Sequence, residues 1–112
     1  MAQTEMDYMN IQGTNGAYGT FVPTTSSFTE IKLSFVPNKV VFWFTWNSQQ
    51  AMVLLYDVTQ SKIFRWFSSS ETGNDITSQF GSLIYMDGTT LKYKALYSGE
   101  YTVTTNYMAY QG

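Results

Sequence analysis

The chain has 112 residues, of which 44% are hydrophobic, 18% aromatic and only 12% charged. It contains no cysteine and no histidine, which excludes disulfide frameworks, thiol nucleophiles, Ser-His-Asp chemistry and nearly all zinc or copper sites. Six basic and eight acidic residues give a formal net charge of −2, so the chain lacks the basic surface that binding to nucleic acid requires. The length fits one domain, and we expect no metal, no cofactor and no nucleic-acid partner.

The N-terminus has neither a basic segment nor an apolar stretch after it, so no signal peptide is predicted. The longest apolar run, residues 40–44, has the length of a strand and is too short to cross a membrane. We therefore expect a chain that begins at its own Met1, stays in the compartment where it is made and does not insert into a membrane.

Residues 1–20 are polar and dotted with glycine, and we expect an extended N-terminal arm or a weak first strand there. The segment from Met1 to Asn15 is either an arm that reaches a neighbouring subunit or a disordered terminus. Residues 21–112 form the predicted folded domain, because β-branched and aromatic residues dominate this part and favour strands over helices.

Alternation of apolar and polar residues indicates the first strands of this domain. At residues 29–35, Ile31, Leu33 and Phe35 alternate with polar side chains, which predicts a half-buried strand. Residues 39–46 are apolar on both faces until Thr45, which predicts a central strand that is covered on both sides.

The second half of the chain contains further strand patterns. We predict strands at residues 51–57 and 62–68, then a polar loop at residues 68–75, whereas residues 76–80 are ambiguous. Residues 81–86 and 89–97 form a predicted hairpin around Asp87-Gly88, a dipeptide that suits a type I′ turn. In the last segment, 100–110, alternate positions share one side, namely Tyr101, Val103, Thr105, Tyr107 and Ala109.

About seven or eight strands thus follow one another at intervals of about 8–12 residues, which is typical of an all-β fold. We predict a single antiparallel β-sandwich with a jelly-roll-like topology.

Two stretches carry a resemblance to a known family. The first is Gly16-Ala17-Tyr18-Gly19, a polar spacer, and then the run from Ile31 to Phe42 with Phe35-Val36-Pro37 in it. The second is the ending, from Gly99-Glu100-Tyr101 to Asn106-Tyr107-Met108-Ala109-Tyr110-Gln111-Gly112. In this order they resemble small β-sandwich domains of bacteriophage tail fibres, baseplates and minor structural proteins. The chain departs from that pattern at Ser34, where such domains often have glycine.

The resemblance implies a tail- or baseplate-associated virion protein that is made in the host cytoplasm and binds the host surface without catalysis. Host glycans are one candidate ligand, and the implied partners are other virion proteins and further copies of the chain, as a trimer. A similar layout occurs in the lectin domain first described in snail agglutinins, which binds N-acetylgalactosamine-type sugars as a hexamer. Two alternatives stay open: a capsid decoration or head-fibre protein, and a free carbohydrate-binding, lectin-like module.

Candidate binding residues follow the strongest strand. Trp46 lies at its end, so an aromatic ring for stacking on a sugar can converge with the polar side chains of Asn47, Gln49 and Gln50. Trp43 and Trp66 are expected to fill the core or a subunit interface instead.

A second set of candidates lies in the polar loop at residues 68–75. Glu71, Asn74 and Asp75 suit a recognition loop at the tip of the sandwich, and their spacing matches no EF-hand, so we expect no calcium site. Nothing indicates that the carboxylates of Asp57, Asp87 and Glu100 meet as a catalytic pair, and we do not expect an enzyme.

Tyrosines recur on the last two predicted strands. Cross-strand packing explains them in part, and the same residues are the candidates for an oligomer interface. They are Tyr93, Tyr97, Tyr101, Tyr107 and Tyr110.

Overall fold

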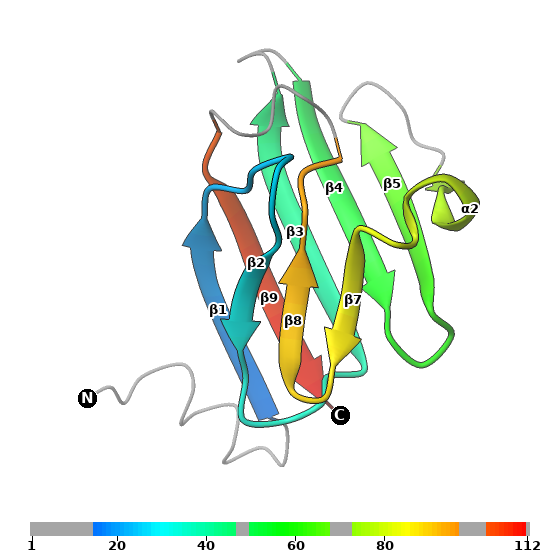
Figure 1. Ribbon diagram of the computed structural model, residues 1–112. Coiled ribbons are helices and arrows are strands. Elements are labelled where there is room, and N and C mark those ends of the chain that lie inside the picture. The colour runs from blue at the N-terminus through cyan, green and yellow to red at the C-terminus, as the bar shows by residue number, and fades with distance from the viewer. Residues whose placement is uncertain (1–14, 47–49, 68–72, 97–102, 112) are drawn as a thin grey trace.

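The computed structural model describes residues 15–46, 50–67, 73–96 and 103–111. These residues form two antiparallel sheets that pack on one another, which confirms the predicted all-β sandwich (Figure 1). The elements are β1 (Asn15–Phe21), β2 (Thr29–Lys32), β3 (Lys39–Trp46), β4 (Gln50–Asp57), β5 (Lys62–Phe67), β6 (Asn74–Asp75), α2 (Thr77–Phe80), β7 (Ile84–Asp87), β8 (Thr90–Tyr93) and β9 (Thr105–Gln111). In the part of the chain described, no helix has the length and apolar character needed to span a membrane.

The strand order brings the two ends of the chain together. The larger sheet has six strands in the order β1-β9-β3-β4-β5-β6, and the smaller has three in the order β2-β8-β7. The first strand pairs with the last from Asn15↔Gln111 to Phe21↔Thr105, and β2 pairs with β8. This nested pairing is the jelly-roll-like part of the fold, whereas β3, β4 and β5 follow one another as a meander (Figure 1).

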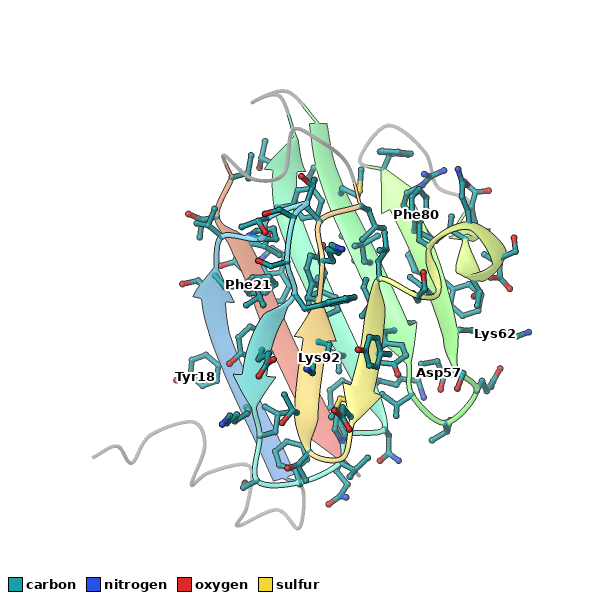
Figure 2. All side chains as sticks on the ribbon, viewed as in Figure 1. Tyr18, Phe21, Asp57, Lys62, Phe80 and Lys92 are labelled. Carbon is teal, nitrogen blue, oxygen red and sulfur yellow. The ribbon has the colours of Figure 1, made fainter. Side chains whose placement is uncertain are left out.

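The core lies between the sheets and is aromatic at its centre. Phe42 of β3 and Tyr93 of β8 are fully buried, and their ring centroids are 4.7 Å apart. Phe21 of β1, labelled in Figure 2, meets the Tyr93 ring edge-on, with 5.0 Å between the ring centroids. Packed aromatic pairs of this geometry add to the free energy of burial, so these three side chains fix the two sheets against each other.

One polar contact also joins the sheets. The backbone N–H of Met86 in β7 donates to the Tyr56 hydroxyl of β4, at a distance of 3.2 Å between nitrogen and oxygen. Burial raises the pKa of Tyr56. The hydroxyl therefore stays protonated at neutral pH and pairs a backbone donor inside the sandwich.

The prediction that β3 is covered on both faces is wrong. Val40, Phe42 and Phe44 point into the core, but Trp43 is 39% exposed and Thr45 is exposed. The physical reason is that the three-stranded sheet covers one face of the six-stranded sheet, while no described element packs on the other (Figure 1). We call this uncovered side the outer face.

The β7–β8 turn also differs from the prediction. Asp87 pairs with Thr90, so Gly88 and Thr89 are the two central residues of the turn. Gly88 has a φ of +63°, and Thr89 is not among the described residues with positive φ. A positive φ at the first central residue alone is the pattern of a type II′ turn, in place of the predicted type I′.

Candidate functional site

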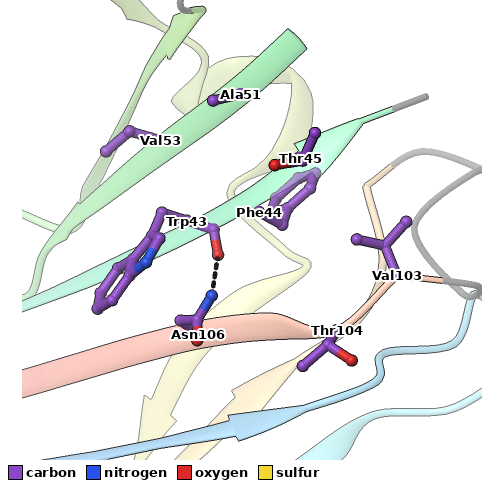
Figure 3. Close-up of a pocket in the computed structure, with 8 residues that line it drawn as sticks. All are labelled: Trp43, Phe44, Thr45, Ala51, Val53, Val103, Thr104 and Asn106. Atoms are coloured by element: carbon purple, nitrogen blue, oxygen red, sulfur yellow. Dashed lines mark hydrogen bonds between the residues drawn. The ribbon is translucent and has the colours of Figure 1, made fainter. Parts of the chain in front are cut away.

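A hollow of about 460 Å³ opens on the outer face where β9 begins beside β3 (Figure 3). β3 pairs with β9 only as far as Trp43↔Asn106, and from there to Trp46 it pairs with β4 alone. The hollow lies in the space that this early separation leaves. It is lined by Trp43, Phe44, Thr45, Ala51, Val53, Val103, Thr104 and Asn106.

One wall of the hollow is apolar and comes from β3 and β4. Trp43 pairs with Val53, and Thr45 with Ala51, so these four residues point to the same side of the sheet. Trp43 and Val53 are 39% and 36% exposed. An exposed indole beside small and branched side chains offers a flat apolar surface on which a ring can stack.

The opposite wall comes from β9 and the residues before it, and it combines the apolar Val103 with the polar Thr104 and Asn106. The Asn106 side-chain amide donates from Nδ2 to the backbone oxygen of Trp43 at 3.2 Å (Figure 3). This bond holds Asn106 beside the indole and uses one N–H of the side-chain amide. It does not involve the amide oxygen, which is a hydrogen-bond acceptor. The exposed hydroxyls of Thr45 and Thr104 add donors and acceptors nearby.

None of the eight lining residues has an ionisable side chain. These described lining residues therefore offer stacking and neutral hydrogen bonds, and none of them is a general acid, a general base or a charged metal ligand. This chemistry suits a neutral ligand that has both an apolar face and hydroxyl groups.

The predicted Trp46 site begins beside this hollow. Trp46 and Gln50 pair at the ends of β3 and β4, one position beyond the lining pair Thr45↔Ala51. Asn47 and Gln49, with the side chains of Trp46 and Gln50, lie outside the described residues.

The second predicted set lies at the far edge of the six-stranded sheet. Asn74 and Asp75 are exposed and form β6, whereas Glu71 lies outside the described residues. The Asp75 carboxylate accepts from Thr77 Oγ1 at 2.6 Å and from Thr77 N at 3.0 Å, and these bonds lower its pKa. Asp75 thus fixes the turn that leads into α2.

The other carboxylates do not form a site among the described residues. Asp57 accepts from Thr59 Oγ1 at 2.7 Å and from Gln60 N at 3.3 Å within the β4–β5 turn. No group of three or more acidic residues that could hold a metal occurs in this part of the chain. Glu100 lies outside it.

The predicted tyrosine row is divided between environments. Tyr93 is fully buried in the core, and Tyr107 faces inward against the Phe21 ring, at 6.1 Å between centroids. Tyr110 lies on the outer face, since it pairs with Lys39 and Gly16. Tyr97 and Tyr101 lie outside the described residues. Tyr93 accordingly has no surface to offer a neighbouring subunit in this monomer.

Trp43 was expected to fill the core or a subunit interface, and its exposed fraction of 39% excludes the core. The alternation along β3 contains the signal: Lys39, Val41, Trp43 and Thr45 share one face and begin and end with polar residues. Trp66 also lies on the outer face, half-buried, where the Gly73 backbone is so close to the indole that a side chain at position 73 would clash.

Comparison with known proteins returned no match: no family model, no curated protein and no solved structure is similar to this chain. The fold therefore defines the class as an all-β sandwich, and the resemblance to virion domains depends on the sequence motifs alone.

Proposed function

We propose that the protein is a non-enzymatic binding subunit of a bacteriophage virion, associated with the tail or baseplate and made in the host cytoplasm. It works as a homo-oligomer and contacts glycans of the host surface. The observation that supports binding is the uncharged hollow beside the exposed Trp43 indole. The virion location is supported by the resemblance of the sequence motifs to phage sandwich domains.

Carbohydrate is the ligand class that the hollow fits best. A pyranose ring has an apolar face that stacks on an indole, and its hydroxyls pair with amide and hydroxyl groups such as those of Asn106, Thr45 and Thr104. The lack of charge in the hollow favours neutral sugars. A single shallow site binds weakly, and several copies on one particle multiply that affinity through avidity.

Catalysis is not part of the proposal. Hydrolysis of a glycosidic bond commonly requires two carboxyl groups that flank the bond. None of the described residues that line the hollow is a carboxylate, and the described Asp57 and Asp75 are engaged in turns at other places.

The test is a glycan array probed with the full chain and with a Trp43→Ala variant. Burial of the apolar face of a sugar against the indole contributes roughly 1–2 kcal/mol, so removal of the indole should weaken binding by about five- to 30-fold. The matched control is Tyr85→Ala, which removes a 37% exposed aromatic side chain from the other sheet and should leave binding unchanged. Equal binding by Trp43→Ala and wild type would contradict the proposed site.

The location is tested separately by mass spectrometry of fractionated virions from the phage that encodes the chain. Recovery with isolated tails supports the proposal. Recovery with heads would replace it by the capsid decoration or head-fibre alternative. Absence from virions combined with sugar binding would support the free lectin-like module.

A further inference from the structure

We infer that the ligand of this site is an extended, neutral oligosaccharide that lies across the strands from Trp43 to Trp66. The inference rests on the sugar binding of the proposed function, and it adds a second stacking position and the shape of the sugar chain. A single sugar unit occupies the hollow beside Trp43, whereas a chain of at least three units also reaches Trp66.

Strand register aligns five residues of the outer face in one row across the larger sheet. The row, which we call the indole row, contains Thr20, Asn106, Trp43, Val53 and Trp66. Residues that pair directly across antiparallel strands point to the same face, so both indoles lie on the outer face. None of the five side chains is ionisable. The row therefore continues the uncharged surface of the hollow past Val53, which lines the hollow beside Trp43 (Figure 3).

The two indoles of the row are separated by one strand. Neighbouring strands lie about 4.8 Å apart, so the backbones of Trp43 in β3 and Trp66 in β5 are roughly 10 Å apart. One pyranose unit of an extended chain is about as long as one strand spacing. Two sugar rings that stack on the two indoles are therefore the first and third of three consecutive units. The ring between them lies over Val53, which is 36% exposed.

Gly73 holds the second indole in an orientation that allows stacking. The register of β5 with β6 continues from Arg65↔Asn74 to Trp66 and Gly73. A Cβ at position 73 would come closest to Cε2 of the indole, with Nε1 and Cζ2 both at 2.5 Å. Cε2 lies where the two rings join, so the clash is with the face of the indole and not with its edge. One face of the half-buried Trp66 therefore lies over Gly73, and the opposite face points outward.

The nearly straight row determines which sugar chains fit. A β-linked chain such as cellotetraose is extended, and its alternate rings present the same face to a flat surface. Such a chain requires units whose two linking positions are equatorial, as in glucose and N-acetylglucosamine. An α-linked chain such as maltotetraose curves, so its rings leave a straight row. No described element packs above this face, and an extended chain can lie along the whole row (Figure 1).

The closing experiment is isothermal titration calorimetry of the full chain with monosaccharides and tetrasaccharides. The monosaccharides are glucose and N-acetylglucosamine, and the β-linked tetrasaccharides are cellotetraose and chitotetraose. Stacking on Trp66 buries additional apolar surface, so at least one β-linked tetrasaccharide should bind about five- to 30-fold more tightly than its monosaccharide. Maltotetraose offers the same number of units as cellotetraose, and its weaker binding isolates the effect of an extended shape.

A variant pair then locates the gain in affinity. Trp66→Ala should weaken binding of the β-linked tetrasaccharide by about five- to 30-fold and leave monosaccharide binding unchanged. The matched control is Tyr18→Ala, which removes a 49% exposed aromatic side chain from the same face but outside the indole row. This control should leave the affinity for both ligands unchanged.

A measurement on the wild type covers the case in which Trp66→Ala fails to fold, since Trp66 also covers a glycine at the sheet edge. Nuclear magnetic resonance should show that the Trp66 indole N–H signal shifts with the β-linked tetrasaccharide and not with the monosaccharide. Trp43→Ala and Trp46→Phe identify the other two indole signals, so the third belongs to Trp66.

Four results would overturn the inference: tetrasaccharides that bind no more tightly than monosaccharides, maltotetraose that binds as tightly as the β-linked chains, unchanged tetrasaccharide binding by Trp66→Ala, or a Trp66 signal that never moves. Binding of galactose or N-acetylgalactosamine alone would overturn it as well. In each of these cases, a monosaccharide that shifts the Trp43 indole leaves the proposed function intact. The absence of binding by any sugar contradicts the proposed function itself.

Discussion

Phe42 and Trp43 are adjacent aromatic residues on opposite faces of β3, and they allow a direct test of the one-sided burial of that strand. Phe42 is fully buried against Phe21 and Tyr93, with ring centroids 6.3 and 4.7 Å away. Trp43 is 39% exposed and faces outward. We predict that Phe42→Ala destabilises the fold much more than Trp43→Ala, although tryptophan is the larger side chain.

The magnitudes follow from burial. Replacement of a fully buried phenylalanine by alanine costs about 3–5 kcal/mol, because lost transfer free energy is joined by a cavity that the core cannot close. Trp43→Ala opens no cavity, since solvent fills the space, and the transfer free energy of its partly covered ring costs about 1–2 kcal/mol. A domain of this size is stable by roughly 6–17 kcal/mol, so both variants should fold.

The assay is urea denaturation followed by circular dichroism at low micromolar concentration, where an oligomer contributes least. The free energy of unfolding should fall by about 2 kcal/mol more for Phe42→Ala than for Trp43→Ala. Equal losses, or a larger loss for Trp43→Ala, would refute the register of β3 and the existence of an uncovered outer face.

Three further predictions concern single positions. Gly88→Ala should lower the free energy of unfolding by about 1 kcal/mol in thermal denaturation, because φ is +63° and the space around an added Cβ is open, so backbone strain alone is tested. Gly88→Asn should cost less, because asparagine adopts a positive φ more readily than alanine. Equal stability of the wild type and both variants would contradict the turn. Tyr56→Phe should cost about 1 kcal/mol in urea denaturation, since the Met86 N–H loses its acceptor, and an unchanged midpoint would contradict that contact. The Thr59 hydroxyl lowers the pKa of Asp57 below its ordinary value of 3.8. The stabilising effect of Asp57 is therefore complete above that value and lost as the pH falls through the lower, folded-state pKa. Stability of Asp57→Asn should accordingly depend less on pH between 6 and 3 than that of wild type, and identical pH profiles would argue against this role.

Much of the fold was predictable from local pattern. The boundaries of β3 and the inward direction of Thr105, Tyr107 and Ala109 follow from alternation, which the sheet geometry enforces. The local pattern does not predict how many strands cover each face of the six-stranded sheet. An apolar β3 is compatible with burial on both faces or with burial on one face only. The two cases are distinguished only by the fold, in which a single three-stranded sheet covers one face of the six-stranded sheet.

The candidate site was harder to predict for a similar reason. The hollow depends on β9 leaving β3 at Trp43↔Asn106, a contact between residues 63 positions apart in sequence. Trp46 was predicted to act together with the polar residues that follow it, because these are its neighbours in sequence. The sheet instead brings Trp43 together with Asn106 and Thr104, which no local motif indicates.

The central claim, sugar binding beside Trp43, is tested most directly by nuclear magnetic resonance. The chain has three tryptophans and thus three indole N–H signals, of which the Trp43 signal is identified by its loss in Trp43→Ala. Titration with N-acetylgalactosamine, galactose and glucose should shift the Trp43 indole and the Asn106 side-chain amide, while the Trp66 indole stays in place. Shifts confined to other residues, or no shift with any of the three sugars at millimolar concentrations, would contradict the account.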